Sequence, residues 1–190
     1  ALATSTSLVN GAHYYASQTV SGCESTARFD VTATVNTTPA APTGTAAQSF
    51  CSAASPTIAD LTATGTAIQW YSSPGGGIPL ATTIFLGNGN HYYASQTVTG
   101  CESTLRFDVA VTVNTTPFAP TGSASQSFCS GASPTVADLT ATGTAILWYA
   151  APSGGAALAT STVLVNGTHY FATQTISGCE STSRFDVTVT

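Results

Sequence analysis

Apolar and polar residues alternate most regularly in residues 104–114. The odd-numbered positions there are apolar, and the even-numbered positions are polar or small. A period of two predicts a β-strand with one buried face. The preceding residues 91–98 are aromatic and β-prone, and residues 99–103 have the composition of a turn. The two segments are therefore predicted to pair as a hairpin.

Shorter segments of the same kind come earlier in the chain and are separated by residues that break regular structure. Pro-Gly-Gly-Gly and Gly-Asn-Gly are the clearest breakers. No segment shows helical spacing over ten residues, so six or seven strands in about 78 residues favour a small antiparallel sandwich. The four additional predicted strands are residues 47–51, 57–64, 67–72 and 82–86.

The chain repeats itself with a period of 78 residues. His13, His91 and His169 begin matching segments at this spacing. A fixed period predicts an array of one structural unit. The recurring Asn-Thr-Thr-Pro-x-Ala-Pro run is typical of a stiff, extended connector and places the boundaries. We predict half a repeat over residues 1–36, a complete repeat over 37–114 and a nearly complete one over 115–190, as in an excerpt from a longer array.

Aromatic residues in register favour an immunoglobulin-like version of the sandwich. Trp70 and Trp148 lie on the predicted third strand, where such folds bury a tryptophan. One tyrosine per repeat starts the penultimate strand, the place of a tyrosine corner. The predicted structural core therefore includes Trp70, Trp148, Tyr14, Tyr92 and Tyr170. We expect an all-β protein of tandem immunoglobulin-like antiparallel β-sandwiches.

Further motifs extend this interpretation to a family. The chain resembles the immunoglobulin-like repeats of very large secreted proteins of the Bacteroidetes, whose members are surface adhesins and gliding-motility filaments exported by the type IX system. The resemblance implies an extracellular, non-catalytic protein with no cofactor. It rests on Pro117-x-x-Pro120, Gln126 to Cys129, Ser133 to Leu139, Trp148-Tyr149 and Gly178 to Ser181.

Composition excludes several classes of function. Only 6% of the residues are charged, 43% are hydrophobic, and the formal net charge is −5 without a single lysine. A nucleic-acid surface needs a basic patch, and a membrane span needs about 18–20 apolar residues in a row. Both are lacking in the sequence. Because the acidic residues, arginines and histidines recur in register, an enzyme would need a complete active site in every repeat, so we expect no catalysis.

The five cysteines predict disulfides. None has the C-x-x-C spacing of a metal or redox site, and small exported domains commonly rely on disulfides. The candidates are Cys51, Cys101, Cys129 and Cys179, while Cys23 is expected to have its partner outside the chain. Two pairings stay open: one within each repeat, such as Cys51 with Cys101, and one between successive repeats, Cys51 with Cys179. In an immunoglobulin topology the first pair would lie at opposite ends of a strand about 26 Å long.

Other polar residues receive structural interpretations. Glu102, Arg106 and Asp108 share one face of a strand and predict a surface ion pair or cross-strand network. His91 is expected to be a hydrogen-bonded strand residue rather than a metal ligand. Asp60 and Asp138 are expected to cap a turn.

The predicted function is structural and adhesive. Tandem repeats would form an extended stalk or filament on a bacterial surface, with neighbouring repeats or identical chains as partners. The alternative is a multivalent carbohydrate-binding module for surface glycans, in which Tyr71, Tyr93 and Tyr149 would present aromatic faces to sugars.

Overall fold

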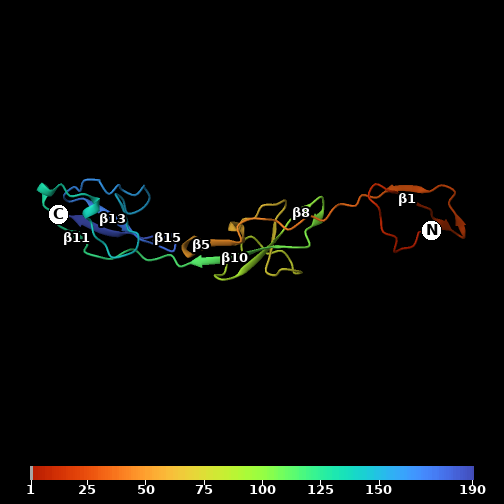
Figure 1. Ribbon diagram of the computed structural model, residues 1–190, viewed down its shortest axis with the longest axis horizontal. Coiled ribbons are helices and arrows are strands. Elements are labelled where there is room, and N and C mark those ends of the chain that lie inside the picture. The colour runs from red at the N-terminus through yellow and green to blue at the C-terminus, as the bar shows by residue number, and fades with distance from the viewer. Residues whose placement is uncertain (1) are drawn as a thin grey trace. The chain divides into compact units, whose positions relative to one another are not determined.

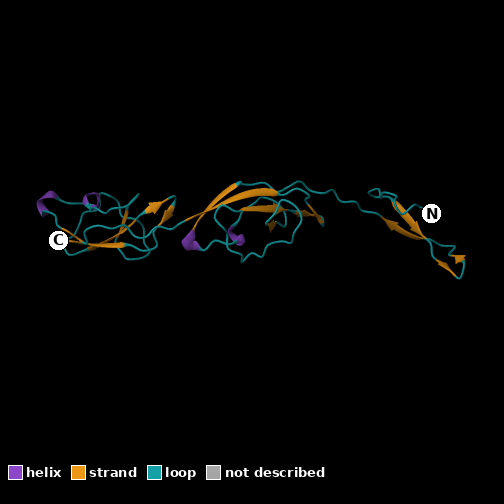
Figure 2. Cartoon of the chain, turned by 90° about the horizontal axis from the view of Figure 1, so that it is seen from below, coloured by secondary structure: helices purple, strands orange, loops and turns teal. Residues whose placement is uncertain are grey.

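The computed structural model describes residues 2–190, which are almost entirely strands and loops (Figures 1 and 2). The first strands are β1 (His13–Ala16), β2 (Thr19–Val20), β3 (Cys23–Glu24), β4 (Phe29–Thr32), β5 (Ala47–Cys51), β6 (Gln69–Tyr71), β7 (His91–Ser95) and β8 (Thr97–Val98). The others are β9 (Cys101–Glu102), β10 (Phe107–Asn114), β11 (Ser125–Gln126), β12 (Leu147–Tyr149), β13 (His169–Thr173), β14 (Thr175–Ile176), β15 (Cys179–Glu180) and β16 (Phe185–Val189). The only helices among these residues are four 3₁₀ turns, η1 (Ser52–Ala54), η2 (Ile58–Asp60), η3 (Ser130–Ala132) and η4 (Val136–Asp138). The prediction of an all-β fold is confirmed.

The chain groups into two compact units that draw on segments distant in sequence. One contains the segment ending at Gly44 together with Thr62–Pro79 and Tyr93–Asp108. The other contains Thr45–Leu61, Leu80–Tyr92 and Val109–Thr190, so it includes the whole third repeat.

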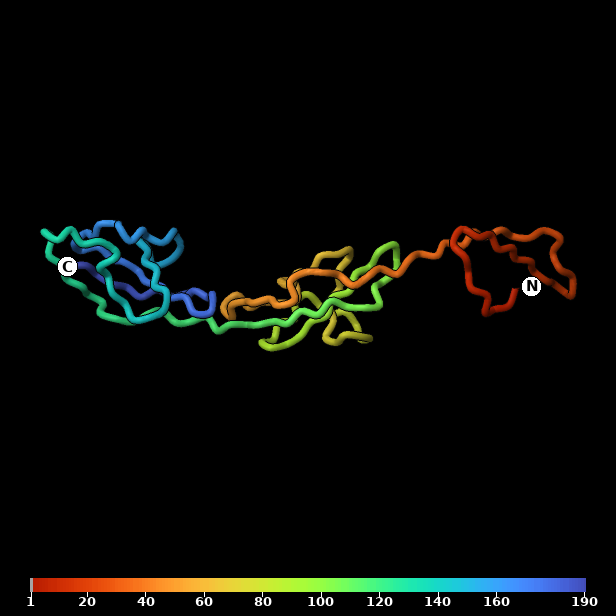
Figure 3. Tube along the Cα trace, viewed as in Figure 1, coloured from red at the N-terminus to blue at the C-terminus, as the bar shows by residue number. Residues whose placement is uncertain are grey.

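The third repeat is built on one four-stranded sheet in the order β11-β16-β13-β12 (Figure 3, blue end of the tube). Strand β13 pairs antiparallel with both β12 and β16. Strand β11 pairs parallel with the end of β16. The sheet is thus antiparallel except at this edge, and β5 pairs with β10 in the same parallel way in the second repeat.

One face of this sheet carries the hydrophobic core. Along β16 the buried residues come at every second position, as a period of two requires, whereas β12 and β13 each end in two adjacent buried residues. The 3₁₀ turn η4 and an irregular segment near Leu164 pack against that face and form the opposing layer. The core consists of Val136, Leu139, Trp148, Leu164, Tyr170, Ala172, Val187 and Val189.

Two predicted strands were wrong. Residues 57–64 contain the turn η2, and residues 82–86 make only an isolated bridge through Phe85 to Thr57. The cause is a capping box: the Asp60 carboxylate accepts hydrogen bonds from the backbone nitrogen and hydroxyl of Thr57, at 2.7 and 3.1 Å. This arrangement satisfies the first amides of a helical turn and competes with extended structure. The predicted capping role of Asp60 is confirmed.

Each repeat contains a tight hairpin with a cysteine just after its turn. The two central turn residues are Ser21-Gly22, Thr99-Gly100 and Ser177-Gly178, and all six have φ between +48° and +81°. Positive φ at both positions is the type I′ geometry that suits two-residue hairpins, and glycine adopts it without strain. The hairpins β2–β3, β8–β9 and β14–β15 therefore present their cysteines in the same way.

Within residues 2–36, strand β1 pairs with β4 and β2 with β3. Tyr14 is half-buried, whereas Tyr92 and Tyr170 are 5% and 4% exposed. The tyrosine-corner hydrogen bond nevertheless recurs, because the hydroxyls of Tyr14, Tyr92 and Tyr170 accept from the backbone five residues earlier, at 2.9, 3.0 and 3.1 Å. Within residues 2–190, no helix has the length and apolar character needed to cross a membrane.

Candidate functional site

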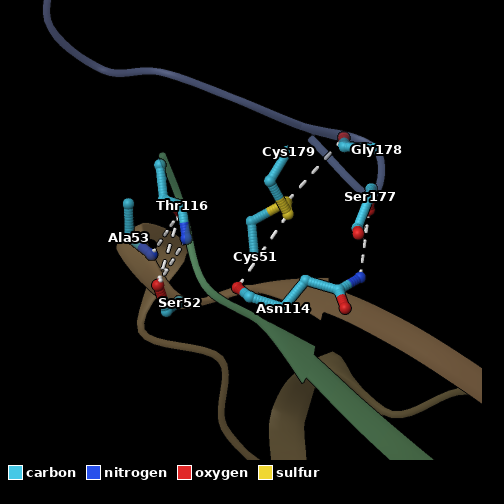
Figure 4. Close-up of a disulfide and its surroundings, with 8 residues drawn as sticks. All are labelled: Cys51, Ser52, Ala53, Asn114, Thr116, Ser177, Gly178 and Cys179. Carbon is cyan, nitrogen blue, oxygen red and sulfur yellow. Dashed lines mark hydrogen bonds between the residues drawn. A yellow bond between two sulfur atoms is a disulfide. The ribbon is translucent and has the colours of Figure 1, made fainter. Parts of the chain in front are cut away.

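A disulfide joins the second repeat to the third. Cys51, at the end of β5, is bonded to Cys179, at the start of β15, with the Cα atoms 5.6 Å apart (Figure 4). The two residues are 128 positions apart in sequence. Of the two pairings left open by the sequence, the structure contains the one between successive repeats.

The linker between the second and third repeats, residues 114–120, contacts the hairpin that carries Cys179 through one hydrogen bond and one sulfur contact. The side-chain amide of Asn114 donates to the carbonyl of Ser177 at 3.0 Å, and the backbone carbonyl of Asn114 lies 4.0 Å from the sulfur of Cys179 (Figure 4). The sulfur of Cys51 lies 3.9 Å from the carbonyl of Gly178. Because Asn114 is the last residue of β10, whose register places it beside Cys51, the linker holds both cysteines at one point.

The other side of the joint is held by Thr116. Its backbone nitrogen donates to the hydroxyl of Ser52 at 3.0 Å, and its own hydroxyl accepts from the backbone nitrogen of Ala53, also at 3.0 Å. The first residues after the disulfide in the second repeat are thereby tied to the linker. The sequence placed Asn114 and Thr116 in the stiff connector between repeats but did not predict these contacts, and Ser52 was not singled out.

The preceding copy of the joint has the same linker contacts. The side-chain amide of Asn36 donates to the carbonyl of Thr99 at 2.7 Å, and the sulfur of Cys101 lies 3.9 Å from the carbonyl of Asn36. Cys101 is nevertheless a free thiol, as are Cys23 and Cys129. The two cysteines of the disulfide are 128 residues apart in sequence. No other cysteine in the sequence lies at this distance from Cys101 or Cys129, which explains why these thiols are free.

Strand direction explains why Cys129 does not pair with Cys179 inside the third repeat. Cys129 follows β11, whose residues pair with the last residues of β16. Cys179 precedes the first residue of that same strand, Phe185. The two cysteines thus belong to opposite ends of β16, a separation larger than a disulfide can span.

A second recurring arrangement surrounds a buried tyrosine. The hydroxyl of Tyr71 donates to Glu102 at 2.6 Å, and the guanidinium of Arg106 lies 3.3 Å from the centre of the Tyr71 ring. Arg106 also donates to the carbonyls of Ser73 and Gly76, both at 2.8 Å. The prediction that Glu102, Arg106 and Asp108 share one strand was wrong, because Glu102 ends β9, Asp108 lies on β10 and Arg106 lies between these strands. Tyr71, from β6, brings Glu102 and Arg106 together and could not be identified from spacing along one strand.

The third repeat reproduces this cluster. Tyr149 donates to Glu180 at 2.6 Å, Arg184 lies 3.5 Å from the centre of the Tyr149 ring, and Arg184 donates to Ala151 and Gly154. The arginine stacks on the tyrosine ring, and the tyrosine hydroxyl bonds the carboxylate. Together these contacts hold the loop before β13 against the sheet.

The same contacts shift the pKa values of the acidic groups. Hydroxyls near the carboxylate, first Ser95 and then Tyr71, lower the pKa of Glu102. Ser95 is fully buried, and its hydroxyl meets no partner in good hydrogen-bond geometry, so it acts mainly as a nearby dipole. The hydrogen bond from Tyr149 and then the nearby hydroxyl of Thr173, which like that of Ser95 meets no partner in good geometry, lower the pKa of Glu180.

The tyrosine pKa values move in the opposite direction. Burial, followed by the hydrogen bond to Glu102, raises the pKa of Tyr71. The hydrogen bond to Glu180, followed by burial, raises the pKa of Tyr149. Both hydroxyls therefore stay protonated and keep donating throughout the neutral range.

Comparison with known families identifies the repeats. The family described as "Ig-like domain CHU_C associated" matches residues 39–114 and again residues 117–190. The chain belongs to this family. Among curated proteins, none matches the chain. The resemblance and the fold class predicted from the sequence are both confirmed, with two Ig-like repeats in tandem.

In these Ig-like domains the aromatic residues singled out from the sequence pack inside the fold. Trp70 and Trp148 are 8% and 7% exposed. Tyr71 and Tyr149 are 3% and 6% exposed and lie under arginines, so neither ring presents a face for a sugar. This leaves Tyr93 as the remaining member of the predicted aromatic set, and it is half-buried.

Histidines of these domains bond to aspartates across the sheet. His169 Nδ1 lies 2.9 Å from Asp186 Oδ1, and His13 is placed in the same way beside Asp30. All four side chains are about half exposed, so the pairs contribute at most about 1 kcal/mol. Within residues 2–190, no three histidine, cysteine or acidic side chains gather as a metal site would require.

The lowered pKa values of Glu102 and Glu180 predict weakening in acid. A carboxyl group whose pKa is lower in the folded state stabilises the fold above its ordinary value of 4.5, and this stabilisation is lost as the pH falls through the folded value. We expect the free energy of unfolding, measured by urea titration, to fall between pH 7 and pH 3.

A double variant, Glu102→Gln with Glu180→Gln, isolates this contribution. It is expected to be less stable than the wild type at pH 7 and to lose less stability on acidification, because neither amide titrates. An equal loss in both proteins would show that other groups cause the acid sensitivity.

Proposed function

We propose that the chain is part of an extended stalk or filament on a bacterial cell surface, in which disulfides between successive repeats carry tension. The observation that supports this most is the Cys51–Cys179 bond, because it connects neighbouring repeats rather than closing one of them. Tandem Ig-like domains are by themselves consistent with a structural repeat protein, and the matching family is associated with extracellular surface proteins. The adhesive role, the surface location and filament formation are parts of the proposal.

The mechanism follows from the covalent path. Tension that reaches Cys51 passes through the disulfide to Cys179 and bypasses the 127 residues between them. Three of the four strands of the third repeat's sheet, β11, β12 and β13, lie inside this covalent loop, whereas β16 follows Cys179 and stays in the path of the tension. Strands β11, β12 and β13 are therefore shielded when the chain is stretched from its ends, and β16, which pairs with β11 and β13, is the strand of this sheet that is loaded directly. Such a bond also requires an oxidising compartment, which agrees with an extracellular location.

The alternative, a multivalent carbohydrate-binding module, is not favoured. Two of its three candidate tyrosines are buried beneath arginines. Sugar-binding aromatics need an exposed ring face for stacking.

Single-molecule stretching of the full chain from its two ends tests the proposal. In oxidising buffer, the fully stretched chain is expected to be shorter than the length of the whole extended chain. The difference is the length of the loop that the disulfide closes. At about 3.3–3.6 Å per residue, 128 residues correspond to roughly 42–46 nm. Adding a thiol reductant should release this length.

The matched control is the variant Cys129→Ser, which removes a cysteine of the same motif outside the bond and should extend like the wild type. If the oxidised wild type already reaches the full extension, tension does not pass through the disulfide and the proposed mechanism is wrong.

A further inference from the structure

The hairpin that carries Cys179 is short. Its strands β14 and β15 pair Thr175 with Glu180 and Ile176 with Cys179. The cysteine is 1% exposed, and its Cα atom lies 5.6 Å from that of Cys51. Because a two-stranded hairpin is marginally stable at best on its own, contacts with the rest of the repeat must hold it in this place.

The strand of the hairpin that bears the cysteine is attached to the sheet through the next residue. Glu180 follows Cys179 and accepts a hydrogen bond of 2.6 Å from the hydroxyl of Tyr149, which lies on β12 and is 6% exposed. Arg184 stacks on the Tyr149 ring at 3.5 Å and is itself held by two backbone carbonyls. Since a hydrogen bond to a carboxylate is stronger than one between neutral groups, Tyr149 provides a firm attachment one residue from the disulfide.

The other strand is attached through Gln174, which directly precedes β14. The backbone nitrogen of Ser181 donates to the carbonyl of Gln174 at 2.9 Å and closes the base of the hairpin. The side-chain amide of Gln174 donates to the carbonyl of Phe118, in the linker, at 2.9 Å. These contacts hold the β14 side, and the hydrogen bond between Tyr149 and Glu180 holds the β15 side, which bears the cysteine.

The second repeat contains the same cluster next to a different cysteine. Tyr71 donates to Glu102 at 2.6 Å, and Arg106 lies 3.3 Å from the centre of the Tyr71 ring. The hairpin β8–β9 that is attached in this way carries Cys101, which is not a partner in the disulfide between the repeats. The chain thus contains two chemically equal clusters, of which the one in the third repeat lies beside the bond.

We propose that Tyr149, Glu180 and Arg184 are positioning residues for the disulfide at the joint. They hold hairpin β14–β15 in the orientation in which Cys179 meets Cys51, and so favour the disulfide over the two free thiols. A disulfide tolerates only about 4.4–6.8 Å between its Cα atoms, so contacts that keep this orientation in the reduced protein lower the entropy that bond formation must remove. This inference deepens the proposed function, on which it rests, by naming the residues that set how strongly the two repeats are joined.

The redox equilibrium of this bond in mixtures of reduced and oxidised dithiothreitol tests the proposal on the full chain. Reduced dithiothreitol gives two electrons and two protons to the disulfide and closes to its own cyclic disulfide, while Cys51 and Cys179 become thiols. Free thiols are alkylated after equilibration, and digestion before aspartate then gives peptides 30–59 and 138–185 either linked or separate. Their ratio across a series of dithiothreitol mixtures gives the equilibrium constant for forming the bond.

The variant Tyr149→Phe removes the hydroxyl that holds Glu180 and keeps the ring beneath Arg184. We expect the equilibrium constant to fall about three- to tenfold, because a hydrogen bond to a charged group contributes a factor of this order. Tyr71→Phe is the matched control, since it makes the same change in the cluster of the second repeat, and it should leave the constant unchanged. The proposal is overturned if Tyr149→Phe has the wild-type constant or if both variants shift it equally.

A core variant of the third repeat separates positioning from general stability. Val136 is 3% exposed and belongs to the hydrophobic core, so Val136→Ala weakens the repeat but removes none of the hydrogen bonds of the cluster. It should leave the equilibrium constant unchanged. A shift as large as that of Tyr149→Phe would mean that the stability of the repeat sets the equilibrium, and would also overturn the proposal.

The same digest separates this inference from the proposed function. If the wild type gives no linked peptides in oxidised dithiothreitol, the bond between the repeats is absent and the proposed function fails. If the linked peptides are present and Tyr149→Phe matches the wild type, only this inference fails.

Discussion

Replacing Cys51 and Cys179 together by alanine is expected to lower the free energy of unfolding by about 5 kcal/mol. The disulfide closes a loop of 128 residues, and the chain-entropy relation for a loop of that length gives about this value. At roughly 2–4 °C per kcal/mol for a chain of this size, Tm should fall by roughly 10–20 °C. Thermal unfolding followed by circular dichroism in non-reducing buffer measures the change.

Two controls distinguish the bond from the side chains. Cys129→Ser removes an exposed thiol that closes no loop, and a surface change of this kind should alter stability by no more than about 0.5 kcal/mol. Reducing the wild type should reproduce the loss seen in the double alanine variant. A double variant as stable as the oxidised wild type would show that the bond is absent or that it does not stabilise the fold.

The second large effect is expected from Trp148→Ala. Trp148 is 7% exposed and packs in the core of the third repeat between the sheet and η4. Truncating a buried tryptophan removes its apolar burial and leaves a cavity, which typically costs about 3–5 kcal/mol. Urea unfolding of the full chain at pH 7 measures the loss.

Its neighbour on the same strand provides the control. Leu147 is 41% exposed, because adjacent residues of a strand face opposite sides of the sheet. Leu147→Ala should therefore cost less than about 1 kcal/mol. If the two variants were equally destabilised, β12 would not be packed as the structure describes.

The sequence predicted the parts of the fold that depend on local pattern. Strand β10 follows the period of two in residues 104–114, and β5 has the predicted bounds, Ala47–Cys51. The segment at residues 57–64 could not be predicted in this way, because its apolar positions are compatible with a strand. The competing hydrogen bonds of Thr57 and Asp60 decide in favour of a 3₁₀ turn.

The candidate site was only partly predictable. The predicted strand direction argued against a bond between Cys51 and Cys101. The spacing of the cysteines along the chain, however, does not show which residues of the next repeat lie near Cys51 in space. Asn114 and Thr116 supply that information through contacts with both repeats. Similarly, Arg106 was predicted on the strand over residues 104–114 but lies just before β10, and its stacking on Tyr71 joins residues 35 positions apart and leaves no periodic signal.

A single disulfide, Cys51–Cys179, covalently connects the second repeat to the third. Non-reducing digestion before aspartate, applied to the native protein, tests it most directly because Cys51 falls in peptide 30–59, Cys101 in 60–107 and Cys179 in 138–185. We expect peptide 30–59 joined to peptide 138–185. A product joining 30–59 to 60–107 would place the disulfide inside the second repeat and contradict the account.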